Sequence, residues 1–185
     1  MKVPLSWLAE YVELVENNPK SVMEQLVRVG IEEESAIGGD ITGPVVVGQV
    51  LDFVEEPQSN GKTIRWCQVR VAKDGQLAID GGDAVRGIVC GARNFEVGDK
   101  VIVSLPGSVL PGGFAIAARK TYGHVSDGMI ASSKELGLND EHAGILRLKE
   151  IDLDPEIGVD AIELLGLGES AAEVNVTPDL SLIHI

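Results

Sequence analysis

The chain has 185 residues and a formal net charge of −14 at pH 7. Its apolar share of 44% is ample for a buried core and excludes global disorder. Aromatic residues make up only 4%, which argues against rows of stacking rings, the usual platform for single-stranded nucleic acid.

The N-terminal part predicts a short helical hairpin. Apolar residues at helical spacing predict a first helix over residues 4–15 with Ser6 as its N-cap. Ser21 and Glu24 form a capping-box pattern for a second helix over residues 21–29, and Gly30 ends it. Residues 31–37 read as extended. Two helices of this length cannot fold alone, so the hairpin is either a cap on the following domain or part of a larger neighbouring one.

The central part predicts a small barrel. Short β-branched runs separated by Gly and Pro clusters predict strands over residues 45–54, 64–72, 87–91 and 100–105. A fifth pairing region spans 114–120 and 128–132, a helical turn spans 133–137, and a further strand spans 145–148. Gly48 marks a bulge or bend. This pattern favours an α+β, mainly β protein built on an OB-fold, a five-stranded Greek-key barrel.

Alternation along residues 64–72 assigns the two faces of the second strand. The face with Cys67, Val69 and Val71 points inward, so Trp66 lies outward as an exposed aromatic, available for packing or for stacking on a base. Beyond the barrel we expect a helix over residues 155–166 and an extended segment from residue 173.

Charge is distributed unevenly along the chain. Residues 45–150 hold twelve Lys and Arg against thirteen Asp and Glu, so the excess acid lies in the flanks. Within residues 84–134 the balance turns positive, through six basic side chains: Arg86, Arg93, Lys100, Arg119, Lys120 and Lys134. A local patch of this kind attracts phosphate although the whole chain repels it at long range. Such binding is weak and salt-sensitive.

Cys67 and Cys90 each lie in an apolar run without a Cys-x-x-Cys partner. This argues against a zinc site and predicts two buried, reduced thiols in a cytosolic protein. No stretch approaches the ~20 apolar residues that a membrane-spanning helix needs, and the amphipathic start is not a secretory signal. We therefore expect a soluble, cytoplasmic protein without a membrane partner.

Candidate binding residues fall at the ends of the predicted strands, where backbone is free to face a ligand. They are Arg93, Asn94, Arg119, Lys120, Ser126, Gly128, Ser132, Ser133 and Lys134.

Each candidate also has a structural interpretation. The cations at 119, 120 and 134 either meet phosphates or sit in water. Arg93 and Asn94 either read phosphate or a base edge, or form a turn. We interpret Met129 as core and His124 as structural. The glycine pair 112–113 is interpreted as a tight turn, since no phosphate-loop pattern follows it.

Several segments, in this order, resemble the N-terminal part of the β subunits of bacterial phenylalanyl-tRNA synthetases. They are VPLSWLAEYV (residues 3–12), LVRVGIEEE (26–34), VVVGQVL (45–51), RGIVCGARNF (86–95), LPGSVLPGGFAIAARKTYGHVSDGMIAS (105–132), KELGL (134–138), HAGIL (142–146) and VNVTPD (174–179).

The resemblance implies that residues 40–150 form a tRNA-binding OB module. Residues 1–39 and 151–179 would belong to one flanking α/β domain, present in part. In the S-x-G-M segment, the resemblance implies that Ser126 and the backbone of Gly128 approach RNA.

For the whole enzyme the resemblance implies an (αβ)2 tetramer with an α subunit, which carries out aminoacylation with ATP and Mg²⁺. No catalytic residue, metal ligand or cofactor is assigned to this chain. The alternatives are a free-standing tRNA-binding or chaperone OB protein, and a structural, protein-binding OB barrel whose RNA surface has decayed.

The last six residues, 180–185 (LSLIHI), depart from the family pattern. They can be encoded by CTGTCTCTTATACACATC, which resembles a transposase end used in preparing sequencing libraries. We therefore expect these residues to be a non-native tail on a truncated chain, which genuine coding sequence at this place would refute.

Overall fold

The computed structural model describes residues 1–16, 18–38, 40–139 and 144–175, so the tail predicted at 180–185 lies outside the described residues. The chain divides into two compact units. The smaller unit combines Met1–Gly39 with Gly168–Ile185, and the larger unit is Asp40–Leu167. The smaller unit is thus assembled from both ends of the chain.

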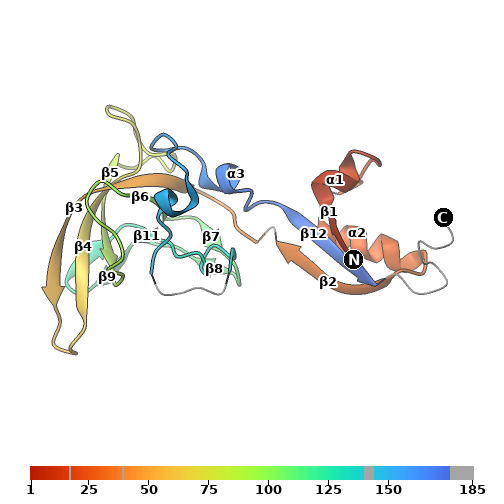
Figure 1. The fold of residues 1–185 in the computed structure, drawn as a ribbon, viewed down its shortest axis with the longest axis horizontal. Helices are drawn as coiled ribbons and strands as arrows, with labels where there is room; N and C mark the ends of the chain where they lie inside the picture. Colours follow the sequence, from red (N-terminus) through yellow and green to blue (C-terminus); the bar gives the residue numbers. More distant parts are fainter. Residues whose placement is uncertain (17, 39, 140–143, 176–185) are drawn as a thin grey trace. The chain divides into compact units, whose positions relative to one another are not determined.

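The smaller unit is a three-stranded antiparallel sheet with two helices (Figure 1). Strand β12 (Ser170–Asn175) lies in the middle, between β1 (Lys2–Pro4) and β2 (Glu32–Gly38). The extended segments expected at 31–37 and from 173 are therefore confirmed, and they pair with each other. Met23 packs with Ala172 and Val174 to form a small core.

Helix α1 covers only Leu5–Ala9, so the helix predicted to residue 15 is too long, and Pro4 rather than Ser6 occupies its N-cap position. Leu5 is buried, but Val12 and Val15 are 49% and 86% exposed. Because a short helix depends on tertiary packing, and the apolar stripe beyond the first turn has none, the helix ends early.

Helix α2 covers Pro19–Arg28 and begins two residues before the predicted start. The side chain of Asn18 caps it by accepting a hydrogen bond from Lys20 N at 2.9 Å. Pro19 follows at the first helical position, where its missing N–H and fixed φ suit a helix start. The Asn-Pro pair therefore overrides the capping-box pattern at Ser21. Gly30 follows the helix with φ of 93°, as expected of a terminating glycine.

The larger unit is mainly β and is built on a curled five-stranded sheet with the order β11-β6-β3-β4-β5 (Figure 1). Its strands are β3 (Val45–Pro57), β4 (Thr63–Arg70), β5 (Val85–Cys90), β6 (Lys100–Ser104) and β11 (Met129–Ile130). All neighbouring strands pair antiparallel. The five predicted strands are confirmed, with β3 longer than expected, and only residues 128–132 of the fifth pairing region supply a strand to this sheet.

Both faces of the sheet are covered, which explains the unbroken valine runs. On β6, Val101 and Val103 enter the core inside the curl, whereas Ile102 enters a second core on the outer face. The inner core also holds Cys67, Val69 and Val71, the face predicted to point inward. Leu148 of the 3-10 helix η1 (Leu148–Ile151) and Ala161 of helix α3 (Ala161–Leu165) cover the outer face.

Of the bulge or bend expected at Gly48, the bulge lies further along β3, where the pairing register with β4 shifts between Val50 and Asp52. A Cβ at position 48 would lie 2.7 Å from Val103 Cγ2 and 3.0 Å from Val69 Cγ1. The glycine is needed because neighbouring side chains pack against its backbone.

Residues 109–126 form two short hairpins, and the pairing region predicted at 114–120 is divided between them. Strands β7 (Val109–Leu110) and β8 (Phe114–Ala115) are one pair, and the glycine pair 112–113 makes the expected turn with φ of 78° and 76°. Strands β9 (Arg119–Thr121) and β10 (His124–Ser126) are the other. Asp127 N donates to Gly87 O at 2.9 Å, which links this segment to the edge of β5 and draws the curl closed.

Two predicted elements near the end of the larger unit are corrected. Residues 145–148 form no strand, since their ladder consists of one isolated bridge, Val101 to Arg147. Helix α3 is shorter than the predicted 155–166 because Gly158 N and Val159 O pair with Val47 of β3, which holds that backbone extended. The helix begins after Asp160, whose carboxylate accepts from Ile162 N and Glu163 N.

Candidate functional site

Two adjoining hollows gather most of the candidate residues. One is an apolar pocket of about 150 Å³ next to β8, β9 and β11, and the other is a polar hollow of about 680 Å³ between the end of β5, residues 129–135 and residues 144–145. Val89 and Met129 line both, so the hollows form one continuous surface.

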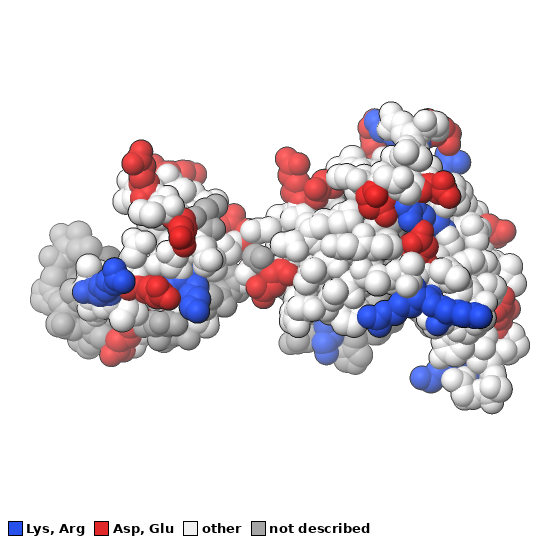
Figure 2. Space-filling model, turned by 180° about the vertical axis from the view of Figure 1, so that it is seen from behind, with Lys and Arg blue, Asp and Glu red and all other residues white. Residues whose placement is uncertain are grey.

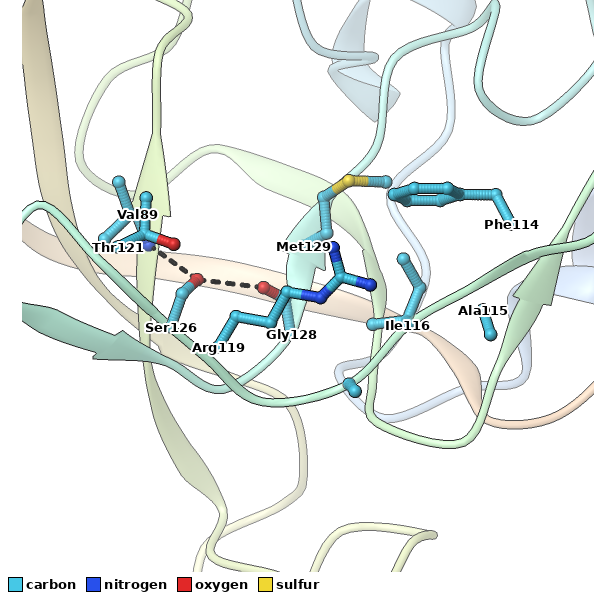
Figure 3. A pocket seen from close by; sticks show the side chains of 10 residues that line it. Val89, Phe114, Ala115, Ile116, Arg119, Thr121, Ser126, Gly128 and Met129 are labelled. Carbon is cyan, nitrogen blue, oxygen red and sulfur yellow. Dashed lines mark hydrogen bonds between the residues drawn. The ribbon is translucent and has the colours of Figure 1, made fainter.

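The apolar pocket is walled by Val89, Ile116 and Met129, with Phe114 at its edge (Figure 3). Arg119 is the one charged residue among those that line it, and its guanidinium carbon lies 5.9 Å from the centroid of the Phe114 ring. Both side chains are exposed. A cation over an aromatic face in a shallow apolar pocket suits a flat ligand with a π-face.

Ser126 and Gly128 also line the apolar pocket, but their polar groups face the fold (Figure 3). The Ser126 hydroxyl accepts from Val89 N and donates to Gly128 O, both at 3.0 Å. Gly128 has a φ of 127°, and a Cβ there would lie 3.0 Å from Ser104 O. The S-x-G-M segment therefore shapes the pocket wall. Met129, interpreted as core, is half-buried and part of both hollows.

The polar hollow brings Arg93 and Lys134 together although they are far apart in sequence. Both are exposed, and no ion pair joins either of them to another described residue. Glu135 lines the same hollow, so two cations and one carboxylate meet there. The net charge of this lining is positive, which favours a phosphate over a carboxylate-rich or cationic ligand.

Ser132 and Glu135 form a capping box that orients Lys134. Glu135 Oε2 accepts from Ser132 N at 2.7 Å and from the Ser132 hydroxyl at 2.8 Å, while Glu135 N donates to that hydroxyl at 3.2 Å. The turn predicted at 133–137 follows and ends at Gly137 with φ of 71°. Ser133 lies in this turn and does not line either hollow.

Asn94 holds the far wall of the polar hollow. Its Nδ2 donates to Ile145 O at 2.9 Å and its Oδ1 accepts from Ile145 N at 3.0 Å. This pairing replaces the missing strand at 145–148, because one side chain satisfies both backbone groups of Ile145. Gly144 is required beside it, since a Cβ there would lie 2.4 Å from Asn94 Cγ.

Lys120 lies apart from the two hollows. It pairs with Val125 across the β9–β10 hairpin and, next to Arg119 on a strand, points to the opposite face. Three of the four exposed cations among the candidates, Arg93, Arg119 and Lys134, are thus brought to one continuous surface, and the fourth is not.

Two of the six basic residues of the predicted patch are paired with acids, one inside the fold and one at the surface. Arg86 is 5% exposed and pairs with Asp80 and Asp127. Lys100 pairs with Asp154 and also donates to Pro155 O at 2.6 Å. The patch is therefore smaller than its sequence count implies. Figure 2 shows Lys and Arg side chains gathered in a row on one face of the larger unit.

Trp66 is not the exposed aromatic that the alternation predicts. Its ring is half-buried and stacks on His124, with the ring centroids 4.3 Å apart. A Cβ on Gly87 would lie 2.2 Å from the indole, so that glycine makes room for it. His124 Nε2 lies 3.0 Å from both carboxylate oxygens of Glu56, which ties the β9–β10 hairpin to the β3–β4 hairpin. This contact between the two hairpins agrees with the structural interpretation of His124.

The two cysteines are buried free thiols, as predicted. Burial raises the pKa of the Cys67 thiol to about 12, with a further contribution from Cys90, and burial also raises the pKa of Cys90. Both thiols are therefore protonated and unreactive in the fold. Across the described ranges, no cluster of three His, Cys, Asp or Glu side chains could hold a metal ion. No helix in the part of the chain that the structure describes is long and apolar enough to span a membrane.

Phe114 is the site residue that the sequence analysis missed. The pairing region predicted at 114–120 includes Phe114 and gives it no binding role, whereas the structure places it at the pocket with 49% of its surface exposed. A weak signal existed, since Phe114 directly follows the Gly112-Gly113 turn, where a side chain at a hairpin tip has little to cover it.

Comparison with known proteins gives two consistent results. A family model described as "Putative tRNA binding domain" matches residues 45–152. Over 97% of the chain, the sequence is 67% identical to a phenylalanine–tRNA ligase beta subunit of Leifsonia xyli, 50% to that of Thermobifida fusca and 45% to that of Tropheryma whipplei. The aligned region covers 22%, 21% and 23% of those relatives, so the chain spans about a fifth of their length. The resemblance stated from the motifs is confirmed.

Proposed function

The chain belongs to the tRNA-binding domain family, and on that premise we propose that its larger unit binds tRNA through the two adjoining hollows. The observation that carries this proposal is the meeting of Arg93, Arg119 and Lys134 on one continuous surface. Cations at the ends of strands on a rigid sheet can meet successive phosphates of a folded RNA.

The binding is electrostatic and modest in strength. Lys120 is the one further cation among the candidates, so at most about four phosphates are neutralised, and the net charge of −14 opposes long-range attraction. Neutralising about four phosphates gives a logarithmic salt slope near −3, equivalent to a loss of roughly 50- to 150-fold between 50 and 200 mM salt.

For Asn94, Ser126, Gly128, Ser132 and Ser133 we propose contributions through backbone groups and through the shape of the hollows. Three of these side chains are engaged inside the fold: Asn94 with Ile145, Ser126 with β5, and Ser132 with Glu135. Their effect on RNA is therefore indirect, because they fix the walls that carry the cations.

We propose that the curled sheet is an OB-fold, a Greek-key barrel inserted in a flanking domain. The antiparallel order β11-β6-β3-β4-β5 and the contact from Asp127 N to Gly87 O support it. The family-model match over 45–152 supports an insert near residues 40–150. Residues 1–39 and the segment from residue 168 would form the flanking domain, and the pairing of β12 with β1 and β2 supports joining both ends of the chain. Residues 151–167, which the sequence analysis placed in that domain, pack on the larger unit instead.

We further propose that this chain is the N-terminal part of a phenylalanine–tRNA ligase β subunit in the cytoplasm. In that assembly it would support attachment of phenylalanine to its tRNA, with an α subunit in an (αβ)2 tetramer and with ATP and Mg²⁺ used elsewhere in the enzyme. The names of the relatives support this assignment. No catalytic residue or metal ligand of this chain is part of the proposal.

Fluorescence anisotropy with labelled tRNA, at low and at physiological salt, tests the proposal. Replacing Arg93 and Lys134 together with alanine should weaken binding and reduce the magnitude of the salt slope by about 1.4–1.8, since two phosphate contacts are lost. The matched control replaces Lys20 and Arg28, two exposed cations of α2 in the smaller unit.

Absence of tRNA binding by the unmodified chain at low salt would refute the proposal. An equal loss in the α2 control would show that only overall charge matters. If tRNA does not bind but the full-length protein still co-purifies with an α subunit, the protein-binding alternative is favoured instead.

A further inference from the structure

Among the described residues of the larger unit, Phe114 is the one aromatic residue that lines either hollow. Phe95 is buried and meets Phe53 edge to face, and Arg65 covers both rings. Trp66 is stacked on His124. Tyr122, 42% exposed, lies at the tip of the β9–β10 hairpin and does not line either hollow. A ligand in the apolar pocket therefore meets a single aromatic face.

The lining of the pocket specifies the chemistry of its occupant. Val89, Ile116 and Met129 supply apolar walls, and the Ser126 hydroxyl already makes its hydrogen bonds within the fold. A sugar would lose hydration there with little in return, and a phosphate that pairs with Arg119 would not use the apolar walls. A flat heterocycle, in contrast, can stack on Phe114 and present an acceptor edge or a π-face to the Arg119 guanidinium (Figure 3).

The polar hollow supplies what the rest of a nucleotide needs. It continues directly from the apolar pocket through Val89 and Met129, and it carries Arg93 and Lys134. An RNA strand that crosses this surface can place a base in one hollow and a neighbouring phosphate in the other. A hydrophobic peptide would fill the pocket but would leave both cations without a partner.

We propose that the apolar pocket takes one unstacked nucleobase of the bound RNA, stacked on Phe114 and flanked by Arg119, while the polar hollow holds an adjoining phosphate. This inference rests on the proposed tRNA binding and names its point of base contact. Stacking is tolerant of base identity, because every base has a π-face. The Ser126 hydroxyl is engaged within the fold, and Thr121 is the other hydroxyl-bearing residue of the lining.

The test is competition against labelled tRNA on the whole 185-residue chain. The competitors are an abasic ribose-phosphate oligomer and the same oligomer carrying a single adenine or a single uracil, so that phosphate charge is equal. Stacking of one base should make the single-base oligomer roughly 5- to 150-fold the stronger competitor.

Variants at the pocket should remove this difference. Phe114→Ala and Phe114→Leu should bring the single-base and abasic oligomers to similar strength, whereas Phe114→Trp should retain the preference. Leucine keeps an apolar side chain without a π-face, so it separates stacking from hydrophobic contact. Tyr11→Ala, which removes an 84%-exposed ring in the smaller unit, is the control and should leave the preference unchanged.

The failures are distinguishable. If labelled tRNA does not bind at all, the proposed function fails and the base pocket falls with it. If tRNA binds but the two kinds of oligomer compete equally, or neither competes, the base pocket is wrong and phosphate contacts alone carry binding. If the preference persists in both Phe114→Ala and Phe114→Leu, the base stacks elsewhere and the proposal is overturned.

Discussion

Replacing Arg86 with methionine removes the charge at the centre of a buried ion-pair cluster and keeps an apolar side chain of similar length. The Arg86 side chain is 6% exposed. Its guanidinium donates to Asp80 Oδ1 at 2.6 Å, to Asp83 O at 2.7 Å and to Asp127. The Arg86→Met variant leaves two carboxylates without their partner inside the fold.

Breaking a buried ion pair costs about 3–5 kcal/mol, because the remaining charge stays desolvated. The Asp80 side chain is 13% exposed and that of Asp127 is 35% exposed, so water relieves part of the penalty at Asp127. We therefore expect the free energy of unfolding to fall by about 3 kcal/mol, at the lower end of that range. Arg70→Met is the matched control. It breaks a pair whose acid, Asp74, is 84% exposed, and should cost under ~1 kcal/mol.

Urea unfolding followed by circular dichroism measures both changes. With an unfolding slope of about 1–3 kcal/mol per molar urea, the Arg86→Met midpoint should fall by about 1–3 M without a change in slope. The salt slope of tRNA binding should stay as in the unmodified chain, since Arg86 does not reach phosphate. A loss no larger than that of Arg70→Met, or a salt slope reduced in magnitude by about one, would refute the reasoning.

Asn94→Ala should lower the free energy of unfolding by about 1–3 kcal/mol in the same titration, because Ile145 loses both backbone partners. Weaker tRNA binding with unchanged stability would contradict this structural role. Because burial raises the thiol pKa values, the free energy of unfolding depends on pH in the alkaline range. The contribution of the buried thiols is fully present below the ordinary thiol pKa of 9.0 and falls as the pH rises toward the Cys67 value of about 12. The slope is about 1.4 kcal/mol per pH unit for this thiol, and Cys67→Ala should flatten the dependence of the urea midpoint on pH. In the native chain both Cys67 and Cys90 should resist a thiol reagent that labels them rapidly in urea, and fast native labelling would count against burial.

Strand positions were predictable where local pattern and tertiary packing agree. The runs that begin at Val45 and Val101 form β3 and β6. Both faces of the sheet are buried, so successive residues of each run pack into one core or the other. Helix ends were less predictable. The apolar stripe that continues to Val15 meets no partner, and Gly158 pairs with β3 where a helix was expected. In both places tertiary contacts overrode the local pattern.

Part of the candidate site was predictable as a set of residues, whereas its arrangement was not. Arg93 and Lys134 meet only because Asn94 and the capping box at Ser132 hold their loops on either side of one hollow. A count of charges gives Arg86 and Arg119 equal weight. It does not show that Asp80 and Asp127 neutralise Arg86, because these acids reach Arg86 only in the folded chain.

By itself, the order of short apolar runs, turn glycines and family motifs determined that this chain forms a mainly β domain related to tRNA-binding modules. These features can be recognised in the sequence because strand alternation and positive-φ turns depend on residues that are neighbours along the chain. Only the tertiary structure decided which polar groups remain free. Burial and ion pairing are set by residues distant along the chain. In the folded chain Arg86 is paired with acids, Trp66 is stacked on His124, and Phe114 lies beside Arg119 at an open pocket.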